Sequence, residues 1–179
     1  MSGPSTWKID GSHNNVEFAV RHLMVSTVRG KFGEVDGTLT LDREHPAASH
    51  VDVTISVASI DTGNEQRDTH LRSADFFDVD THPNLTFRST SIAPVGGEKY
   101  KVTGDLTIRG VTHSVTLDAE VIGFNKSPWG HNVVGFEGKT TISRKAWGLE
   151  WNVALETGGV MVSDEVRISL DFEAIEQAA

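Results

Sequence analysis

The sequence predicts an all-β protein made of antiparallel strands and interrupted by one short polar helix. Apolar and polar residues alternate in about eight stretches, no apolar helical stripe separates them, and one polar run stands between residues 62 and 74. Alternation with a period of two puts one face of a strand against a core and the other in water, which is typical of antiparallel sheet. Parallel βαβ folds are excluded, because they place helices between their strands.

The alternating stretches run through the whole chain. We expect strands near residues 16–22, 28–41, 51–57, 85–87, 100–108, 115–121, 134–138 and 166–172, with a bend at Gly33, where the alternation changes phase. Residues 109–112, RGVT, predict a tight hairpin. A second helical turn is expected at residues 143–148, where Gly148 would end it.

Such a sheet can form either a barrel or a filled sandwich. Glycine falls at inward positions of several strands, where it suits sharply coiled strands and leaves room inside; these positions are Gly30, Gly37, Gly104 and Gly138. A barrel of eight strands can hold one small ligand. Periodicity alone leaves the sandwich open as the alternative.

The polar run between residues 62 and 74 predicts a helix that covers no core. Thr62 and Glu65 have the spacing of a capping box, which would start the helix near Gly63. Asp68 and Arg72 are expected to pair across one turn. A helix this polar lacks the apolar stripe with which a helix normally covers a core.

The apolar residues in and after this helix suggest how it could sit on a barrel. Leu71 is the clear apolar residue of the helix, and Phe76 and Phe77 follow it. We interpret the segment as a cap across the barrel mouth, with Leu71 pointing inward and the two phenylalanines plugging the opening. The alternative is a solvated connector with a hydrophobic anchor.

Composition and motifs argue against several classes of function. The chain has 16 lysine and arginine residues against 25 aspartate and glutamate residues, a net charge of −9, with no basic cluster, so we expect no nucleic-acid partner. With no cysteine there is no disulfide and no thiol nucleophile. P-loop, G-x-G-x-x-G and G-x-S-x-G motifs do not occur. The eight histidines show no metal-binding spacing, so we expect no metal and no cofactor.

The N-terminal sequence bears on where the protein resides. The residues MSGPSTWKIDGSHNN lack the charged and apolar regions of a signal peptide. No later apolar run approaches the length of a transmembrane helix. We therefore expect a cytoplasmic protein with no integral membrane segment.

Four segments together resemble the YceI family of bacterial lipocalin-like, polyisoprenoid-binding proteins. They are WKIDGSHNNVEFAVRHLMVSTVRGKFGEVDGTL, NEQRDTHLRSADFFDVDTHPNLTFRST, GDLTIRGVTHSVTL and SRKAWG with SDEVRISLDFEAI. The second is the most specific, since N-x-x-R-D-x-x-L followed by F-F-D and P-x-x-x-F is not a general β pattern. The resemblance covers residues 7–175, so we treat residues 1–179 as one domain.

This resemblance implies an eight-stranded antiparallel lipocalin-like barrel with one short helix capping its mouth. In the family the pore holds a long isoprenoid or a similar lipid, and the members look dimeric, so a homodimer is possible here too. Many members carry a signal peptide, which this sequence does not show.

We therefore hypothesise a non-enzymatic protein that carries or sequesters a long apolar ligand, such as a polyprenyl pyrophosphate or an isoprenoid quinone. The inward phase of the strands predicts the cavity lining: Phe18, Val20, Phe32, Val53, Ile55, Phe87, Leu106, Ile108, Val115, Leu117 and Phe136. Leu71, Phe76 and Phe77 are expected to complete it, and His22 and Arg67 to meet the head of the ligand. Two alternatives stay open: an enzyme acting on a buried lipid-like substrate with His22 as general base, and a filled β-domain acting as an interaction or stress protein.

Overall fold

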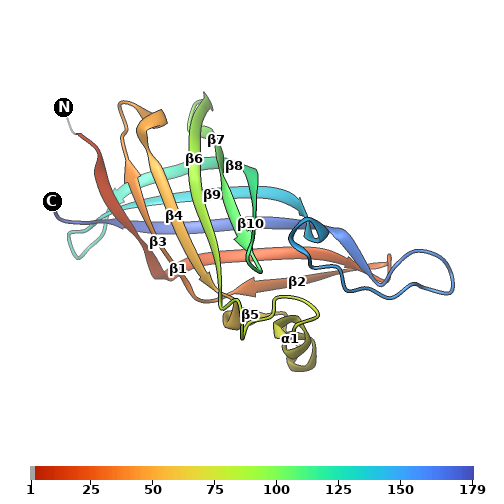
Figure 1. Ribbon diagram of the computed structural model, residues 1–179. Helices are drawn as coiled ribbons and strands as arrows, with labels where there is room; N and C mark the ends of the chain where they lie inside the picture. Colours follow the sequence, from red (N-terminus) through yellow and green to blue (C-terminus); the bar gives the residue numbers. More distant parts are fainter. Residues whose placement is uncertain (1–2) are drawn as a thin grey trace.

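The computed structural model describes residues 3–179, and its strands follow the alternating stretches of the sequence (Figure 1). The strands are β1 (Ser5–His22), β2 (Ser26–Phe32), β3 (Val35–Leu41), β4 (His50–Ser56), β5 (Ile60–Asp61), β6 (Asn84–Gly96), β7 (Lys99–Ile108), β8 (Val111–Lys126), β9 (Asn132–Ser143) and β10 (Val162–Glu176). The α-helix of this range is α1 (Glu65–Arg72), and short 3-10 turns lie at Pro46–Ala48, Val57–Ser59 and Arg144–Trp147. Between residues 3 and 179, no helix is both long and apolar enough to span a bilayer.

The sheet curls round until its first and last long strands pair. Neighbours in the order β10–β9–β8–β7–β6–β4–β3–β1 are hydrogen-bonded, and β10 also pairs with β1, with Phe18 opposite Ile168. All of these pairs are antiparallel. The predicted eight-stranded antiparallel barrel is therefore confirmed.

The long strand β1 serves two neighbours in turn. Its first residues pair with β3, as Trp7 does with Leu39, and its later residues pair with β2, as Phe18 does with Gly30. On its other side β2 meets only the two residues of β5. The chain then leaves the sheet until β6, and α1 lies in this connection at one end of the barrel (Figure 1).

Different elements surround the two ends of the barrel, the helix end and the loop end. The helix end has α1, the β7–β8 turn and the 3-10 turn at Arg144–Trp147. The loop end has the β3–β4 connection and the β6–β7 and β8–β9 turns, and both chain termini lie near it (Figure 1).

The start of α1 differs from the predicted capping box. Asn64 is the N-cap, and its side-chain oxygen accepts a hydrogen bond from the Arg67 backbone N–H at 2.9 Å. The Thr62 hydroxyl instead donates to the Asp68 carboxylate at 2.5 Å. The expected pair between Asp68 and Arg72 does not form, because Asp68 turns inward and Arg72 donates to backbone carbonyls of the preceding segment.

Two turns follow the predicted chemistry. The RGVT hairpin joins β7 to β8 through Arg109 and Gly110, whose φ angles of 51° and 74° are the pair that a type I′ turn requires. The 3-10 turn at Arg144–Trp147 ends at Gly148, which has a left-handed φ of 81°. Both predictions are confirmed.

The inward glycines were predicted to leave room inside the barrel, but at most of them a neighbouring side chain occupies that space. A Cβ added at three of the four positions would collide with a side chain, and these positions are Gly30, Gly37 and Gly104. The Phe18 ring covers Gly30, where an added Cβ would lie 2.3 Å from Cζ, and the Phe87 ring covers Gly104 in the same way at 2.5 Å. These glycines make room for a neighbouring side chain rather than for a ligand. Gly138 alone of the four borders the barrel cavity.

Candidate ligand-binding cavity

The barrel encloses a cavity of about 430 Å³ with a predominantly apolar wall. This volume falls within the range of ligand pockets, roughly 300–1,000 Å³. All eleven strand residues predicted from inward phase lie on this wall: Phe18, Val20, Phe32, Val53, Ile55, Phe87, Leu106, Ile108, Val115, Leu117 and Phe136. The structure places each of these side chains on the cavity wall, and their contact with a ligand stays a prediction.

The helix end of the cavity is filled by apolar side chains from the segment that contains α1. Leu71, Phe76 and Phe77 all border the cavity, and Phe76 is only 6% exposed. The Phe77 ring packs edge-on against Phe32, with ring centroids 6.0 Å apart. Arg109 donates to the Phe76 carbonyl at 2.9 Å and so ties this segment to the β7–β8 turn. The segment caps one end of the barrel.

Arg67 does not border the cavity. Its side chain turns back along α1, where Nε donates to the Thr62 hydroxyl at 2.7 Å and an Nη donates to the Thr62 carbonyl at 2.7 Å. Asp68, which is 4% exposed, accepts from the backbone N–H of Thr62 at 3.0 Å. The expectation that Arg67 meets the head of a ligand is not supported by this placement, because the residue fixes the start of the helix.

His22 also lies away from the cavity wall. It is the last residue of β1, and its carbonyl accepts hydrogen bonds from the turn that leads to β2. The alternation that places Val20 on the wall continues to His22, but the cavity ends before it. A role for His22 as a base or at the head of a ligand therefore stays a prediction.

Arg144 is a buried cation at the helix end that the sequence reasoning did not single out. It borders the cavity and is 4% exposed. Its guanidinium donates to four backbone carbonyls, those of Leu149, Trp151, Val162 and Ser163. Burial lowers the pKa of the guanidinium. Arg144 thereby holds the β9–β10 connection against the barrel.

At the loop end the cavity wall reaches solvent. Arg43, Tyr100 and Phe124 border the cavity there, Arg43 is exposed, and Phe124 is 37% exposed. The Arg43 Cζ atom lies 4.0 Å from the centroid of the Phe124 ring. Trp7 also packs against Phe124 in an edge-to-face arrangement, with ring centroids 5.9 Å apart. The entrance to the cavity therefore lies opposite α1.

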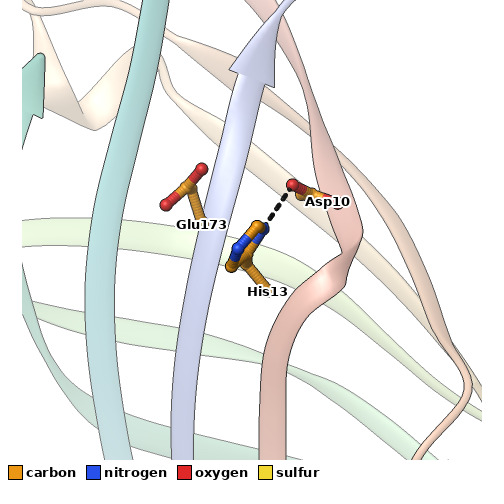
Figure 2. Close-up of side chains that lie close together, drawn as sticks. All are labelled: Asp10, His13 and Glu173. Carbon is orange, nitrogen blue, oxygen red and sulfur yellow. Dashed lines mark hydrogen bonds and ion pairs between the residues drawn. The ribbon is translucent and has the colours of Figure 1, made fainter. Parts of the chain in front are cut away.

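A cluster of ionisable groups lies on the outer face, outside the cavity. Figure 2 shows His13 between Asp10 and Glu173, and these three side chains offer donor atoms within 4.8 Å of one another. The hydrogen bonds from His13 and from Ser12 lower the pKa of Asp10 to about 2. The hydrogen bond with Asp10 and the charges of Asp10 and Glu173 raise the pKa of His13. The cluster links the irregular part of β1 to β10.

Comparison with known proteins identifies the family. A sequence model described as the YceI-like domain matches residues 7–174. The chain belongs to the YceI-like family. Protein YceI of Escherichia coli O157:H7 is 42% identical over 173 residues, which are 96% of this chain and 87% of that protein.

Solved structures of similar proteins share the barrel. The crystal structure of BcnA from Burkholderia cenocepacia matches with a TM-score of 0.79 at 30% identity, over 92% of this chain and 98% of that one. A polyisoprenoid-binding domain from Saccharophagus degradans matches with a TM-score of 0.70 over 96% of this chain and 98% of that one. The second match has 15% identity and shows a shared fold.

Two residues of the cavity wall in this YceI-like chain, Arg43 and Phe124, were not predicted from the sequence, and the alternating pattern could have predicted one of them. Arg43 stands two residues after Leu41 and keeps the inward phase of β3, so the alternation could have found it. Phe124 could not be found in this way. The register between β8 and β9 shifts between Val121 and Gly123, and this shift moves Phe124 from the outward to the inward set.

Proposed function

We propose that this YceI-like protein binds a long apolar chain, such as a polyisoprenoid, inside the barrel, and carries or sequesters it without changing it chemically. The observation on which this rests is the cavity of about 430 Å³ with its apolar wall. A small ligand with several polar groups would leave them without partners against such a wall, whereas a hydrocarbon tail would not.

The energetics favour a chain-like ligand. Each methylene moved from water to an apolar surface contributes about 0.8 kcal/mol. Several isoprene units therefore supply enough free energy for tight binding with no charged contact along the tail. The apolar plug of Leu71, Phe76 and Phe77 fits the far end of such a tail, since it offers hydrocarbon and aromatic surface at the point where the cavity closes.

The relatives support the same class of ligand. The Saccharophagus degradans domain with the same fold is described as polyisoprenoid-binding. Transfer of that property to this chain rests on the cavity, since the two sequences share only 15% identity.

The first experiment is organic extraction of the purified protein followed by mass spectrometry. We expect a long-chain lipid in the extract, and we expect emptied protein to take up an added long-chain prenol. Protein that yields no lipid and takes up no prenol would contradict the proposed function.

A cavity-filling variant tests where the lipid sits. Gly138 borders the cavity, and a Cβ added there would make only ordinary contacts, 3.5 Å from Leu170 Cδ1. Gly138→Leu should therefore lose lipid content because its side chain takes up cavity space, while the matched control Gly138→Ala should keep it. Equal lipid content in both variants would place the lipid outside the barrel.

A further inference from the structure

The contact between Arg43 and Phe124 spans the entrance of the cavity. Arg43 follows β3 and Phe124 belongs to β8, and these strands are separated by three strands in both directions around the ring. The guanidinium nevertheless lies 4.0 Å from the ring centroid. This pair therefore crosses the loop end instead of running along the wall, and it brings a cation to the point where the apolar cavity meets solvent.

Within the described part of the chain, the charge of Arg43 has no acidic partner. Among residues 3–179 it takes part in none of the ion pairs. The carboxylate of the adjacent Asp42 accepts hydrogen bonds from the backbone of Glu44 and His45. Stacking on an aromatic face holds the guanidinium plane while its N–H groups, which point outward along the edge, stay able to donate.

The other charged residues that border the cavity do not compete for this role. Glu17 of β1 and Glu137 of β9 are exposed and alternate with the inward residues of their strands. Arg144 is at the helix end, and its guanidinium already donates hydrogen bonds to four backbone carbonyls. Glu120 alternates with the inward residues of β8, so its side chain faces solvent. Glu98 is exposed in the β6–β7 turn. Arg43 is thus the cation that a group emerging from the cavity meets first.

We propose that Arg43 binds the head of the ligand, and that the ligand is an amphiphile whose long apolar tail ends in an anionic, oxygen-bearing head, either a phosphate ester or a carboxylate. This inference rests on the proposed function. A tail that fills the cavity up to Phe76 and Phe77 leaves its head at the loop end, beside Arg43. The guanidinium fork matches both kinds of head, because it donates two parallel hydrogen bonds to a pair of anionic oxygens.

The test measures the affinity of the emptied protein for geranylgeranyl diphosphate, oleate and the neutral geranylgeraniol. We expect wild-type protein to bind at least one anionic ligand about tenfold more tightly than the neutral alcohol, the size of a hydrogen bond to a charged group. Arg43→Gln should remove this preference and leave the affinity for the alcohol within about twofold. Arg43→Lys keeps the charge and should retain part of the preference. The matched control is Arg88→Gln, which removes an exposed arginine from the outside of the barrel.

The outcomes distinguish a phosphate ester from a carboxylate head. They also distinguish failure of the role of Arg43 from failure of the proposed lipid binding. Loss confined to the diphosphate assigns a phosphate ester, and loss confined to oleate assigns a carboxylate. Equal affinities of wild-type protein for charged and neutral ligands would overturn the role of Arg43. Equal weakening of the binding of all three ligands in Arg43→Gln would also overturn it. That result would mean that the contact between Arg43 and Phe124 retains any ligand in the cavity, whatever its head. Failure of all three ligands to bind wild-type protein that also yields no lipid on extraction would overturn the proposed function itself.

Discussion

The two ends of this barrel use polar side chains in opposite ways. At the helix end, Arg67, Asp68 and Arg144 form hydrogen bonds with hydroxyl and backbone groups of the protein. The cavity there is bordered mainly by apolar side chains. At the loop end, Arg43 stacks on Phe124 and keeps its donors free. A polar stretch of sequence beside a barrel can therefore mark where a segment is fixed rather than where a ligand's head lies.

This difference separates stability from binding. Changes to the buried polar groups of the helix end should lower the free energy of unfolding, because each group satisfies others that are shielded from water. Changes at the exposed loop end should leave stability near the wild-type value and act on ligand affinity.

The largest loss of stability is expected from Arg144→Met. The substitution keeps much of the apolar stem but leaves four backbone carbonyls without their donor, which should lower the free energy of unfolding by about 3 kcal/mol or more. Urea unfolding followed by tryptophan fluorescence measures this loss. The control is Lys145→Met in the same turn, where the side chain is exposed. A result for Arg144→Met equal to that of the control would contradict the account of the helix end.

Asp68→Asn should have the next largest effect. Asp68 accepts hydrogen bonds from the backbone N–H and the hydroxyl of Thr62 and is 4% exposed. An amide removes the charge and one acceptor oxygen, so we expect a loss of about 2 kcal/mol. Thermal and urea unfolding should report it, whereas the exposed Glu65→Gln on the same helix should stay close to wild type. If both variants unfold alike, Asp68 does not fix the start of α1.

The glycines of the sheet predict a difference between two alanine variants. A Cβ at Gly104 would lie 2.5 Å from both the Arg88 carbonyl and the Phe87 ring, while a Cβ at Gly138 would meet its nearest atom at 3.5 Å. Gly104→Ala should therefore cost about 1–3 kcal/mol through overpacking, and Gly138→Ala should be nearly neutral. Equal stability of the two variants in urea would contradict this account, because it would mean that both the Phe87 ring and the Arg88 carbonyl move aside without loss.

The smallest effect is expected from the outer-face pair of Asp10 and the exposed His13, and it depends on pH. Because the pKa of His13 is raised, its contribution to stability is fully present below its ordinary pKa of 6.5 and is lost as the pH rises through the higher folded value. The pKa of Asp10 is lowered from 3.8 to about 2. Its contribution to stability is therefore fully present above pH 3.8 and is lost as the pH falls from there through the folded pKa of about 2. The gap in melting temperature between wild type and His13→Gln should be larger at about pH 5.5 than at about pH 8.5. A gap that is constant or that grows with pH would contradict the pairing.

Local patterns in the sequence were enough to predict much of the fold. The alternation depends only on neighbouring residues, so the strands, the RGVT turn and the inward set that includes Phe18 and Leu117 could be read from it. Closure of the barrel could not, because periodicity does not record that β10 pairs with β1. The family resemblance supplied that step.

Features that depend on contacts between distant residues were missed or misplaced. Thr62 has the spacing of a cap, but a buried acceptor in Asp68 takes its hydroxyl, and Asn64 caps the helix instead. The role of Gly104 depends on the ring that the next strand lays over it. The inward turn of Phe124 depends on a register shift that alternation cannot show.

The central claim is that an apolar tail lies in the barrel with its head at the loop end, and the position of a bound tail tests it most directly. The measurement is a crystal structure of the complex with a long-chain prenyl phosphate that carries bromine at the far end of its tail, located by anomalous scattering. We predict the bromine beside Leu71, Phe76 and Phe77, and the phosphate within hydrogen-bonding distance of Arg43. A bromine beside Phe124 or outside the barrel would contradict the account.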